Sequence, residues 1–170
     1  SKKVKICHFS NYKSKLKKII NFDLEKIDKK TLKFKYDNVI IFNVFEHLNN
    51  INIPLKNINN ILKKDGKILG STPFIYRIHG APNDHFRFTR ENLLISLRNN
   101  GFKKITIKEL GTGPFLASFS LLRSYLKYLP IIYEILLLIV LSIDLVIKIF
   151  MKTNPKIIYP IGYIFSAKKK

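Results

Sequence analysis

A strand, a helix and a second strand in close succession constrain the fold of this chain more than any other feature. Residues 36–43 are a short apolar, β-branched run of the kind that is buried on both faces of a parallel sheet. Residues 54–62 then carry apolar side chains at helical spacing, with Pro54 in the first turn. Residues 67–73 form a second short strand. The pattern predicts a right-handed β-α-β unit and an α/β fold.

Polar residues gather where these two strands end. Glu46 and His47 come just after the first strand, and residues 74–88, after the second strand, are rich in ionisable and aromatic side chains. Open α/β sheets bind their ligands in the crevice outside the carboxyl ends of the strands, so we expect a site there. The alternative for Glu46 and His47 is a simple helix-start pair satisfied by backbone amides.

The segments after this loop fit the same fold. Thr89 is expected to cap a helix that ends at Asn100 and Gly101. Residues 105–110 then have the pattern of an amphipathic strand. The Gly-Thr-Gly run at residues 111–113 is interpreted as a flexible loop, because a lone Gly-x-Gly is a weak sign of a cofactor site. We expect the leucines of the helix to lie in the core: Leu93, Leu94 and Leu97.

Four segments of this region resemble the class I S-adenosylmethionine-dependent methyltransferases, and most closely their type 11 group. In chain order they are FNVFEHLNN, ILKKDGKILGSTPF, IHGAPNDHFRFTRENL and NNGF. The resemblance covers about residues 21–110 and the last strand. It implies a Rossmann-like, seven-stranded sheet with S-adenosyl-L-methionine over the carboxyl ends of its first strands. It also implies methyl transfer to a small-molecule, saccharide or lipid-linked acceptor, in a group often associated with bacterial cell-surface polysaccharide, lipid and quinone pathways.

The resemblance assigns four residues to the cofactor. Asp23, with Leu24 beside it, stands where the family has an acidic residue that accepts a hydrogen bond from the adenine amino group. Asn43 and Val44 would border the cofactor at the end of the family's fourth strand.

The resemblance places five other residues on the acceptor side. Glu46, His47 and His79 would be the catalytic residues, with His79 or His47 able to take a proton from the acceptor. Asp84 and Arg87 would bind the substrate, or pair with each other and brace the loop.

One part of the family pattern is absent. The first strand and its glycine-rich turn have no counterpart, since the first plausible strand, residues 4–9, resembles the family's second strand. Ser1 in place of a methionine also suggests a truncated or processed chain. We therefore expect an N-terminally truncated methyltransferase domain over residues 1–170. The alternatives are a degenerate domain that serves as a binding or scaffold protein, and a peripheral membrane protein.

Composition narrows the classes of partner. The formal net charge is +20, but only five of the 31 basic residues are arginines, and no nucleic-acid-binding motif or arginine-rich aromatic cluster occurs. We therefore expect no nucleic-acid partner. His79, Asp84 and His85 match no metal-binding motif, so no metal site is expected. The single cysteine, Cys7, excludes an internal disulfide framework and suits the reducing cytoplasm. We expect a cytoplasmic protein that could lie at the inner face of the membrane.

Residues 115–152 include the longest apolar stretch and are expected to form a helical insertion before the last strand, residues 157–167. Pro130 should start a helix in this segment. At 100° per residue, four charged residues fall within an arc of about 80°, which leaves a broad apolar face. They are Glu134, Asp144, Lys148 and Lys152.

This charged edge argues against a plain membrane-spanning helix. The apolar face could pack on the sheet or cover the acceptor site. It could also form a homodimer through residues 131–152, or lie in a membrane interface beside the lysines of residues 168–170. The sequence leaves these alternatives open.

Overall fold

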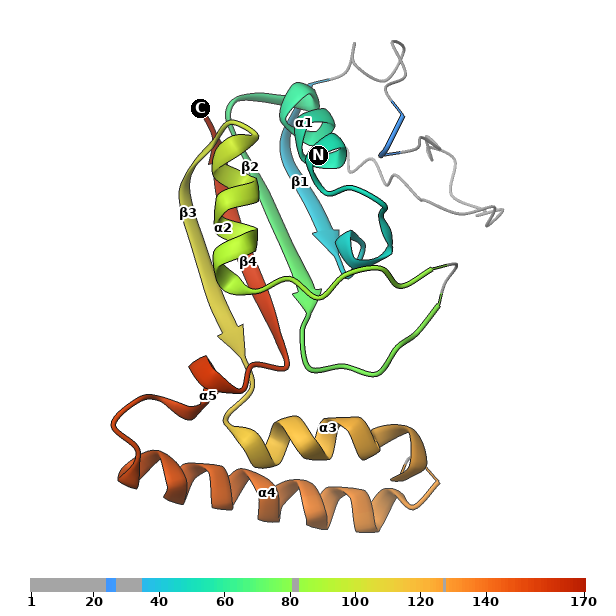
Figure 1. Cartoon of the computed structure of the whole chain (residues 1–170), viewed down its shortest axis with the longest axis vertical. Helices are drawn as coiled ribbons and strands as arrows, with labels where there is room; N and C mark the ends of the chain where they lie inside the picture. The colour runs from blue at the N-terminus through green and yellow to red at the C-terminus, as the bar shows by residue number, and fades with distance from the viewer. Residues whose placement is uncertain (1–23, 27–34, 81–82, 127) are drawn as a thin grey trace, which may run out of the picture.

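The chain forms a mixed four-stranded sheet with helices in its described part, as the computed structural model shows (Figure 1). The expected strand at residues 4–9 and the predicted adenine-binding Asp23 lie outside the described residues. The structure describes residues 24–26, 35–80, 83–126 and 128–170.

The described strands have the spatial order β1-β2-β4-β3. β1 and β2 are parallel, whereas β4 is antiparallel to both β2 and β3. β1, β2 and β3 therefore end at the same edge of the sheet (Figure 1). Their bounds are β1 (Tyr36–Phe42), β2 (Leu62–Pro73), β3 (Phe102–Leu110) and β4 (Gly162–Lys169).

Two helices cover one face of this sheet (Figure 1). α1 (Asn52–Ile61) joins β1 to β2, and α2 (Arg90–Asn99) precedes β3. Thr89 caps α2 as predicted, because its side chain accepts a hydrogen bond from the backbone N–H of Asn92 at 3.2 Å. Gly101 follows α2 with φ of 82°, a left-handed conformation that favours glycine at a helix end.

The core lies between the sheet and these two helices. Leu93 and Leu97 are fully buried as predicted, and Leu94 is partly buried against them. A Cβ atom on Gly70 would lie 2.3 Å from Cζ of Phe165, so only glycine lets this ring lie across β2. Other large, fully buried side chains are Phe45, Leu48, Leu55, Ile58, Leu62, Ile68 and Phe102.

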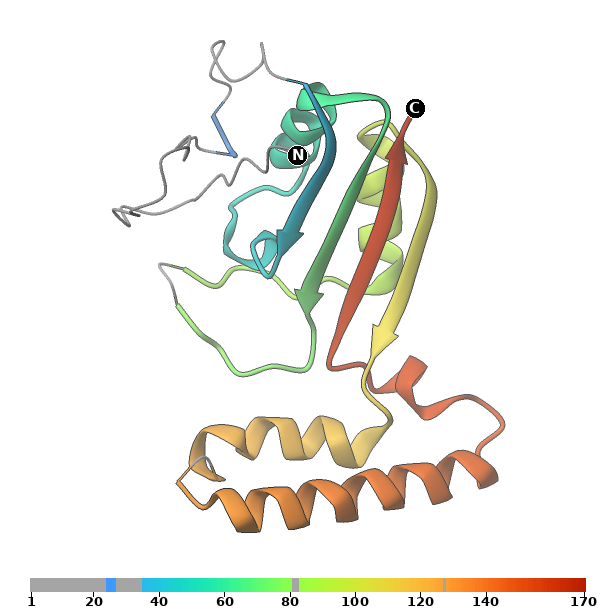
Figure 2. The ribbon, with the colours of Figure 1, turned by 180° about the vertical axis from the view of Figure 1, so that it is seen from behind.

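No described helix covers the opposite face of the sheet (Figure 2). On β1, Ile40 is 66% exposed and Phe42 is 50% exposed. The prediction that this strand is buried on both faces is therefore wrong for the described residues. An apolar strand is buried only where other elements cover it, and β1 is the end strand of the described sheet.

A helical hairpin lies along the edge where β1, β2 and β3 end (Figures 1 and 2). α3 (Pro114–Leu126) follows β3, and α4 (Pro130–Phe150) runs back along α3, on the side away from the sheet. The short α5 (Pro155–Ile158) then leads into β4. Pro130 starts α4 as predicted. In the described part of the chain, α4 is the one helix long and apolar enough to cross a membrane, with a mean hydropathy of 2.4.

The charged edge expected along α4 is interrupted at Asp144, which is only 1% exposed. Its carboxylate accepts a hydrogen bond from the Thr112 hydroxyl at 2.6 Å and from the backbone N–H groups of Phe115 and Leu116 at 3.0 Å. Asp144 thus caps α3 from the neighbouring helix. The Gly-Thr-Gly loop, expected to be flexible, is held around this carboxylate, since a Cβ on Gly113 would lie 2.6 Å from Oδ1 of Asp144.

The C-terminal lysines do not lie beside the hairpin. Because β4 is antiparallel to β2, its carboxyl end is at the opposite edge of the sheet (Figure 1). Lys169 donates there to the carbonyl groups of Asn59 and Leu62, at 2.6 and 2.9 Å. The expectation that these lysines flank an apolar membrane face is therefore wrong.

Candidate functional site

The candidate site lies where β1 and β2 end, as the sequence predicts. After β1 the chain turns at Asn43, whose φ of 50° is left-handed, and enters a 3-10 helix, η2 (Phe45–His47). The backbone N–H of Asn43 donates to the carbonyl of Ser71 at 3.0 Å, and the Ser71 hydroxyl donates to Oδ1 of Asn43 at 2.8 Å. These bonds join the two strand ends and hold η2 beside the loop at residues 74–88.

Glu46 is a buried acid without a hydrogen-bond partner for its carboxylate. The side chain is 0% exposed, and neither carboxylate oxygen has a hydrogen bond. Its nearest ionisable neighbour is Nε2 of His47, 3.7 Å from Oε1, which is too long for a hydrogen bond. Burial raises the pKa of Glu46 above its usual value. The alternative of a helix-start carboxylate satisfied by backbone amides therefore does not hold.

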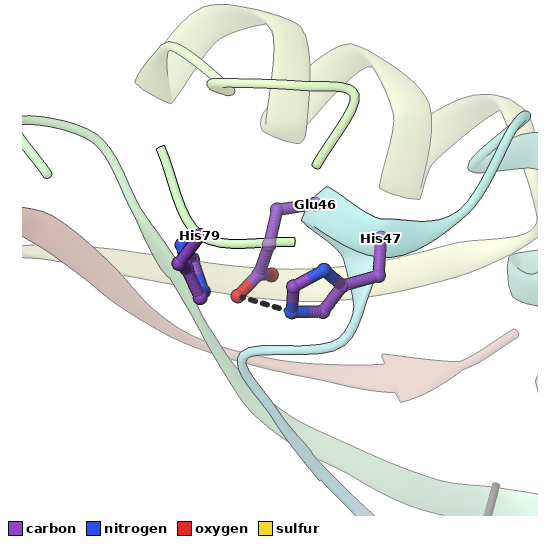
Figure 3. A group of neighbouring side chains, drawn as sticks. All are labelled: Glu46, His47 and His79. Carbon is purple, nitrogen blue, oxygen red and sulfur yellow. Dashed lines mark ion pairs between the residues drawn. The ribbon is translucent and has the colours of Figure 1, made fainter. Parts of the chain in front are cut away.

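Two histidine rings converge on this carboxylate (Figure 3). The ring centroids of His47 and His79 are 5.0 Å apart, at 76° to each other. Nδ1 of His47 donates to the carbonyl of Asn83, which leaves Nε2 directed at Glu46. Nδ1 of His79 lies 3.2 Å from the Asp84 carboxylate. One ligand atom from each histidine and one Glu46 oxygen all lie within 4.8 Å of one another.

Asp84 and Arg87 form an ion pair next to Nδ1 of His79. The Asp84 side chain is 3% exposed, and both guanidinium Nη atoms of Arg87 bond its carboxylate, Nη2 at 2.7 Å. Hydrogen bonds from Arg87 hold the pKa of Asp84 well below its usual range, and Asp84 in turn raises the pKa of Arg87. The backbone N–H of His79 also donates to Asp84 at 2.9 Å. The pair thus braces the loop, and substrate binding by these two residues stays a prediction.

The residues predicted for the cofactor are only partly described. Leu24 is partly buried against the core, and its carbonyl accepts a hydrogen bond from Asn57 Nδ2 at 2.7 Å. Val44 also packs against the core, and the side-chain oxygen of Asn43 is bonded to Ser71. Asp23, the residue predicted to bind adenine, lies outside the described residues.

Two contributors to the site are missed by sequence reasoning. The carbonyl of Asn83 orients His47, and the ring of Tyr76 packs at 5.0 Å from His79, nearly perpendicular to it. Neither lies in a periodic element, so no spacing signal could identify them. Only the polar and aromatic character of the loop marked the region as functional.

Solved structures with a similar fold include S-adenosylmethionine-dependent methyltransferases and a cyclase. A SAM-dependent methyltransferase from Archaeoglobus fulgidus is 18% identical, with a TM-score of 0.54 over 89% of this chain and 67% of that chain. Phosphoethanolamine N-methyltransferase 2 from Haemonchus contortus, in complex with S-adenosyl-L-methionine, is 15% identical, with a TM-score of 0.51 over 90% of this chain and 37% of that chain. The [4+2]-cyclase SpnF is 13% identical, with a TM-score of 0.53, and this chain spans 56% of it.

The sheet, the covering helices and these likenesses define the class of fold. The chain has the Rossmann-like α/β fold of class I methyltransferases, as predicted. No protein-family model and no curated protein sequence matches the chain. Because the identities are low and one similar structure is named as a cyclase, the likeness establishes the fold, and the reaction is argued from the site.

The described residues fit S-adenosylmethionine in part. Asn43 and Val44 stand at the carboxyl end of β1, where the fold would bring the cofactor, and β1 leaves Ile40 and Phe42 exposed. Oδ1 of Asn43 accepts a hydrogen bond from Ser71, so the Nδ2 group of Asn43 and the backbone of this turn would be the parts available to border a ligand. The described residues would therefore form one border of such a site.

Proposed function

We propose that this chain belongs to an S-adenosylmethionine-dependent methyltransferase and provides its acceptor side. The observation that supports this most is the convergence of Glu46, His47 and His79 at the carboxyl edge of β1 and β2, within a methyltransferase fold. Ligands of open α/β sheets bind at that edge. When bound, the cofactor supplies a methyl group that is already activated by its sulfonium, so the protein's main contribution is orientation.

The described residues would orient the acceptor beside β1. The loop that carries His79 is tied to η2, because the backbone N–H groups of His85 and Phe86 donate to the carbonyl of Glu46 at 2.7 and 3.3 Å. An acceptor that reaches the rings of His47 and His79 would therefore meet a braced surface. Removal of a proton from the acceptor by His79 or His47 stays a prediction.

Cofactor binding is the first test of this proposal. We expect calorimetric titration of the chain with S-adenosylhomocysteine to show micromolar binding, and Asp23→Ala to abolish it, because an acidic residue at this point is expected to bind adenine. Asp37→Ala, which replaces an exposed acid paired with Lys63, is the matched control and should bind normally. Binding that persists in Asp23→Ala would contradict the predicted site. No binding by the parent chain would favour a degenerate scaffold.

We propose a lipid-linked acceptor, presented to this site at a membrane surface that α4 contacts. The side of α4 away from α3 exposes an apolar face in which Ser142 is the one polar residue, and the hydroxyl of Ser142 donates to the carbonyl of Leu138. The exposed apolar residues are Ile131, Ile132, Ile135, Leu138, Ile139, Leu145, Val146, Ile149 and Phe150. At 100° per residue they occupy an arc of about 140°.

The charges beside this face favour an anionic lipid surface. Arg123, Lys148 and Lys152 are exposed along the hairpin, whereas Glu134 is its one exposed acid among the described residues. Cations at the rim of an apolar face add attraction to anionic headgroups. Asp144 does not oppose insertion, because its carboxylate is buried against α3.

The hairpin geometry argues for a helix that lies in the interface rather than one that spans the bilayer. α3 has 13 residues, a length of about 20 Å, and a bilayer core is about 30 Å thick. Since α3 and α4 pack side by side, α4 could cross only by carrying the shorter α3 with it or by separating from it. If α4 instead lies in the interface and contacts lipid through the face away from α3, α3 need not enter the bilayer and the two helices need not separate.

Vesicle flotation tests this contact. We expect the chain to float with vesicles that contain phosphatidylglycerol, and the double variant Leu138→Glu/Leu145→Glu to lose most of that binding. Ile95→Glu, on an exposed position of α2, is the matched control and should float normally. Equal flotation of the double variant would refute the proposal. A dimer in solution that the double variant disrupts, without vesicle binding by the parent chain, would show that α4 is a protein interface instead.

A further inference from the structure

We propose that Glu46, His47 and His79 form a binding site for a divalent transition-metal cation such as Zn²⁺. Two imidazole nitrogens and one carboxylate oxygen, all within 4.8 Å of one another, are the donor set that such cations prefer. Zn²⁺ binds nitrogen and oxygen ligands at about 2.0–2.2 Å, so a small contraction of the cluster would bring these atoms to a common ion. The proposal concerns cation binding alone and holds whether or not the chain transfers methyl groups.

The buried carboxylate of Glu46 is the first reason for this assignment. Both oxygens lack a hydrogen-bond partner, although the side chain is fully buried. A buried charged group without partners is costly, so native proteins pair it or use it to coordinate a metal. In the described part of the chain, the groups that approach this carboxylate are the rings of His47 and His79 (Figure 3).

The hydrogen bonds on the far side of both rings are the second reason. Nδ1 of His47 donates to the carbonyl of Asn83, and Nδ1 of His79 faces the carboxylate of Asp84. Metal-binding histidines almost always donate their other ring N–H to a carbonyl or a carboxylate, which fixes the tautomer and the direction of the free nitrogen. Both histidines here have such a partner, so each can present Nε2 to an ion.

The surroundings of the cluster also leave room for a further ligand. His47 and His79 are 15% and 26% exposed, so one side of the cluster is open to solvent, while Glu46 closes the other. Three protein ligands with an open position are typical of catalytic rather than structural zinc sites. The open position would take an oxygen or nitrogen donor of a small molecule, such as a hydroxyl or carboxylate.

Asp84 would act on this site as a positioning residue. It bonds both the backbone N–H and the ring of His79, and Arg87 holds it in place. Loss of such an outer partner typically weakens metal binding by about tenfold to a hundredfold. Asp84→Asn should therefore reduce affinity without changing the number of ions bound.

The test is calorimetric titration of the chelator-treated full chain with Zn²⁺. Because Cys7 and His8 are adjacent thiol and imidazole ligands, the parent protein for this test carries Cys7→Ser and His8→Ala. We expect one Zn²⁺ per chain, with a loss of at least about tenfold in affinity in Glu46→Gln and in His79→Ala. His85→Ala, a histidine in the same loop but outside the cluster, is the matched control and should bind as the parent does.

Thermal unfolding supplies a second readout that separates lost binding from lost folding. A cation that binds only the folded chain raises its melting temperature, so Zn²⁺ should stabilise the parent and His85→Ala. The same Zn²⁺ concentration should raise the melting temperatures of Glu46→Gln and His79→Ala by less, and a cooperative transition in both variants shows that they still fold. The proposal would be overturned if the parent did not bind Zn²⁺. It would also be overturned if Glu46→Gln and His79→Ala bound Zn²⁺ as tightly as the parent.

Discussion

Asp84→Ala is expected to destabilise the folded chain by about 3 kcal/mol, because it removes one member of a largely buried ion pair. The Asp84 carboxylate is 3% exposed and bonds both Arg87 and the backbone N–H of His79. Without it, the guanidinium of Arg87 loses its partner while its other donors stay committed to loop carbonyls. The Arg87 side chain is 24% exposed and can turn partly to water, which places the expected loss at the lower end for a broken buried pair.

Urea denaturation followed by circular dichroism measures this loss. Asp37→Ala is the matched control, since its ion pair with Lys63 joins side chains that are 75% and 52% exposed. Such surface pairs contribute little, so the control should unfold near the parent midpoint. Equal shifts in the two variants would contradict a bracing role for Asp84.

Asp144→Ala is expected to cost about 2 kcal/mol and to fray the first turn of α3, because Asp144 caps this helix. Its carboxylate accepts hydrogen bonds from the Thr112 hydroxyl and from the N–H groups of Phe115 and Leu116. Alanine is the better helix former by a few tenths of a kcal/mol, so part of the cost is offset within α4. Amide hydrogen exchange at Phe115 and Leu116 should report the fraying directly.

Glu134→Ala is the matched control for this variant. It also replaces an acid by alanine on the same helix, with a smaller gain in helix propensity because Glu is a better helix former than Asp. Glu134 is exposed and caps nothing in the described structure. We expect it to leave exchange at Phe115 unchanged and stability equal or slightly higher. Unchanged exchange in Asp144→Ala as well would show that α3 does not depend on this cap.

The sequence predicts those helix ends and strands that depend on a few neighbouring residues. The cap at Thr89, the start of α4 at Pro130 and the two strands that flank α1 all follow from propensity and periodicity over a few residues. The position of Glu46 and His47 at the carboxyl edge follows from the strand order of an α/β unit.

The remaining features depend on contacts between distant segments. Helical spacing places Asp144 on one charged edge with other ionisable residues of the same segment, yet its hydrogen-bond partners lie about thirty residues earlier, beyond any local pattern. The exposure of Ile40 was missed because burial of a strand depends on what covers it. The convergence of His47 and His79 depends on loop bonds to Asn83 and Asp84, which no periodicity encodes.

The place of β4 in the sheet sets the order in which this chain can fold during synthesis. β4 follows every other described element in sequence, but it lies between β2 and β3 and carries Phe165 into the core. The sheet therefore stays incomplete until β4 has left the ribosome. By then α3 and α4 have already emerged, so the apolar face of α4 is present before the sheet is complete.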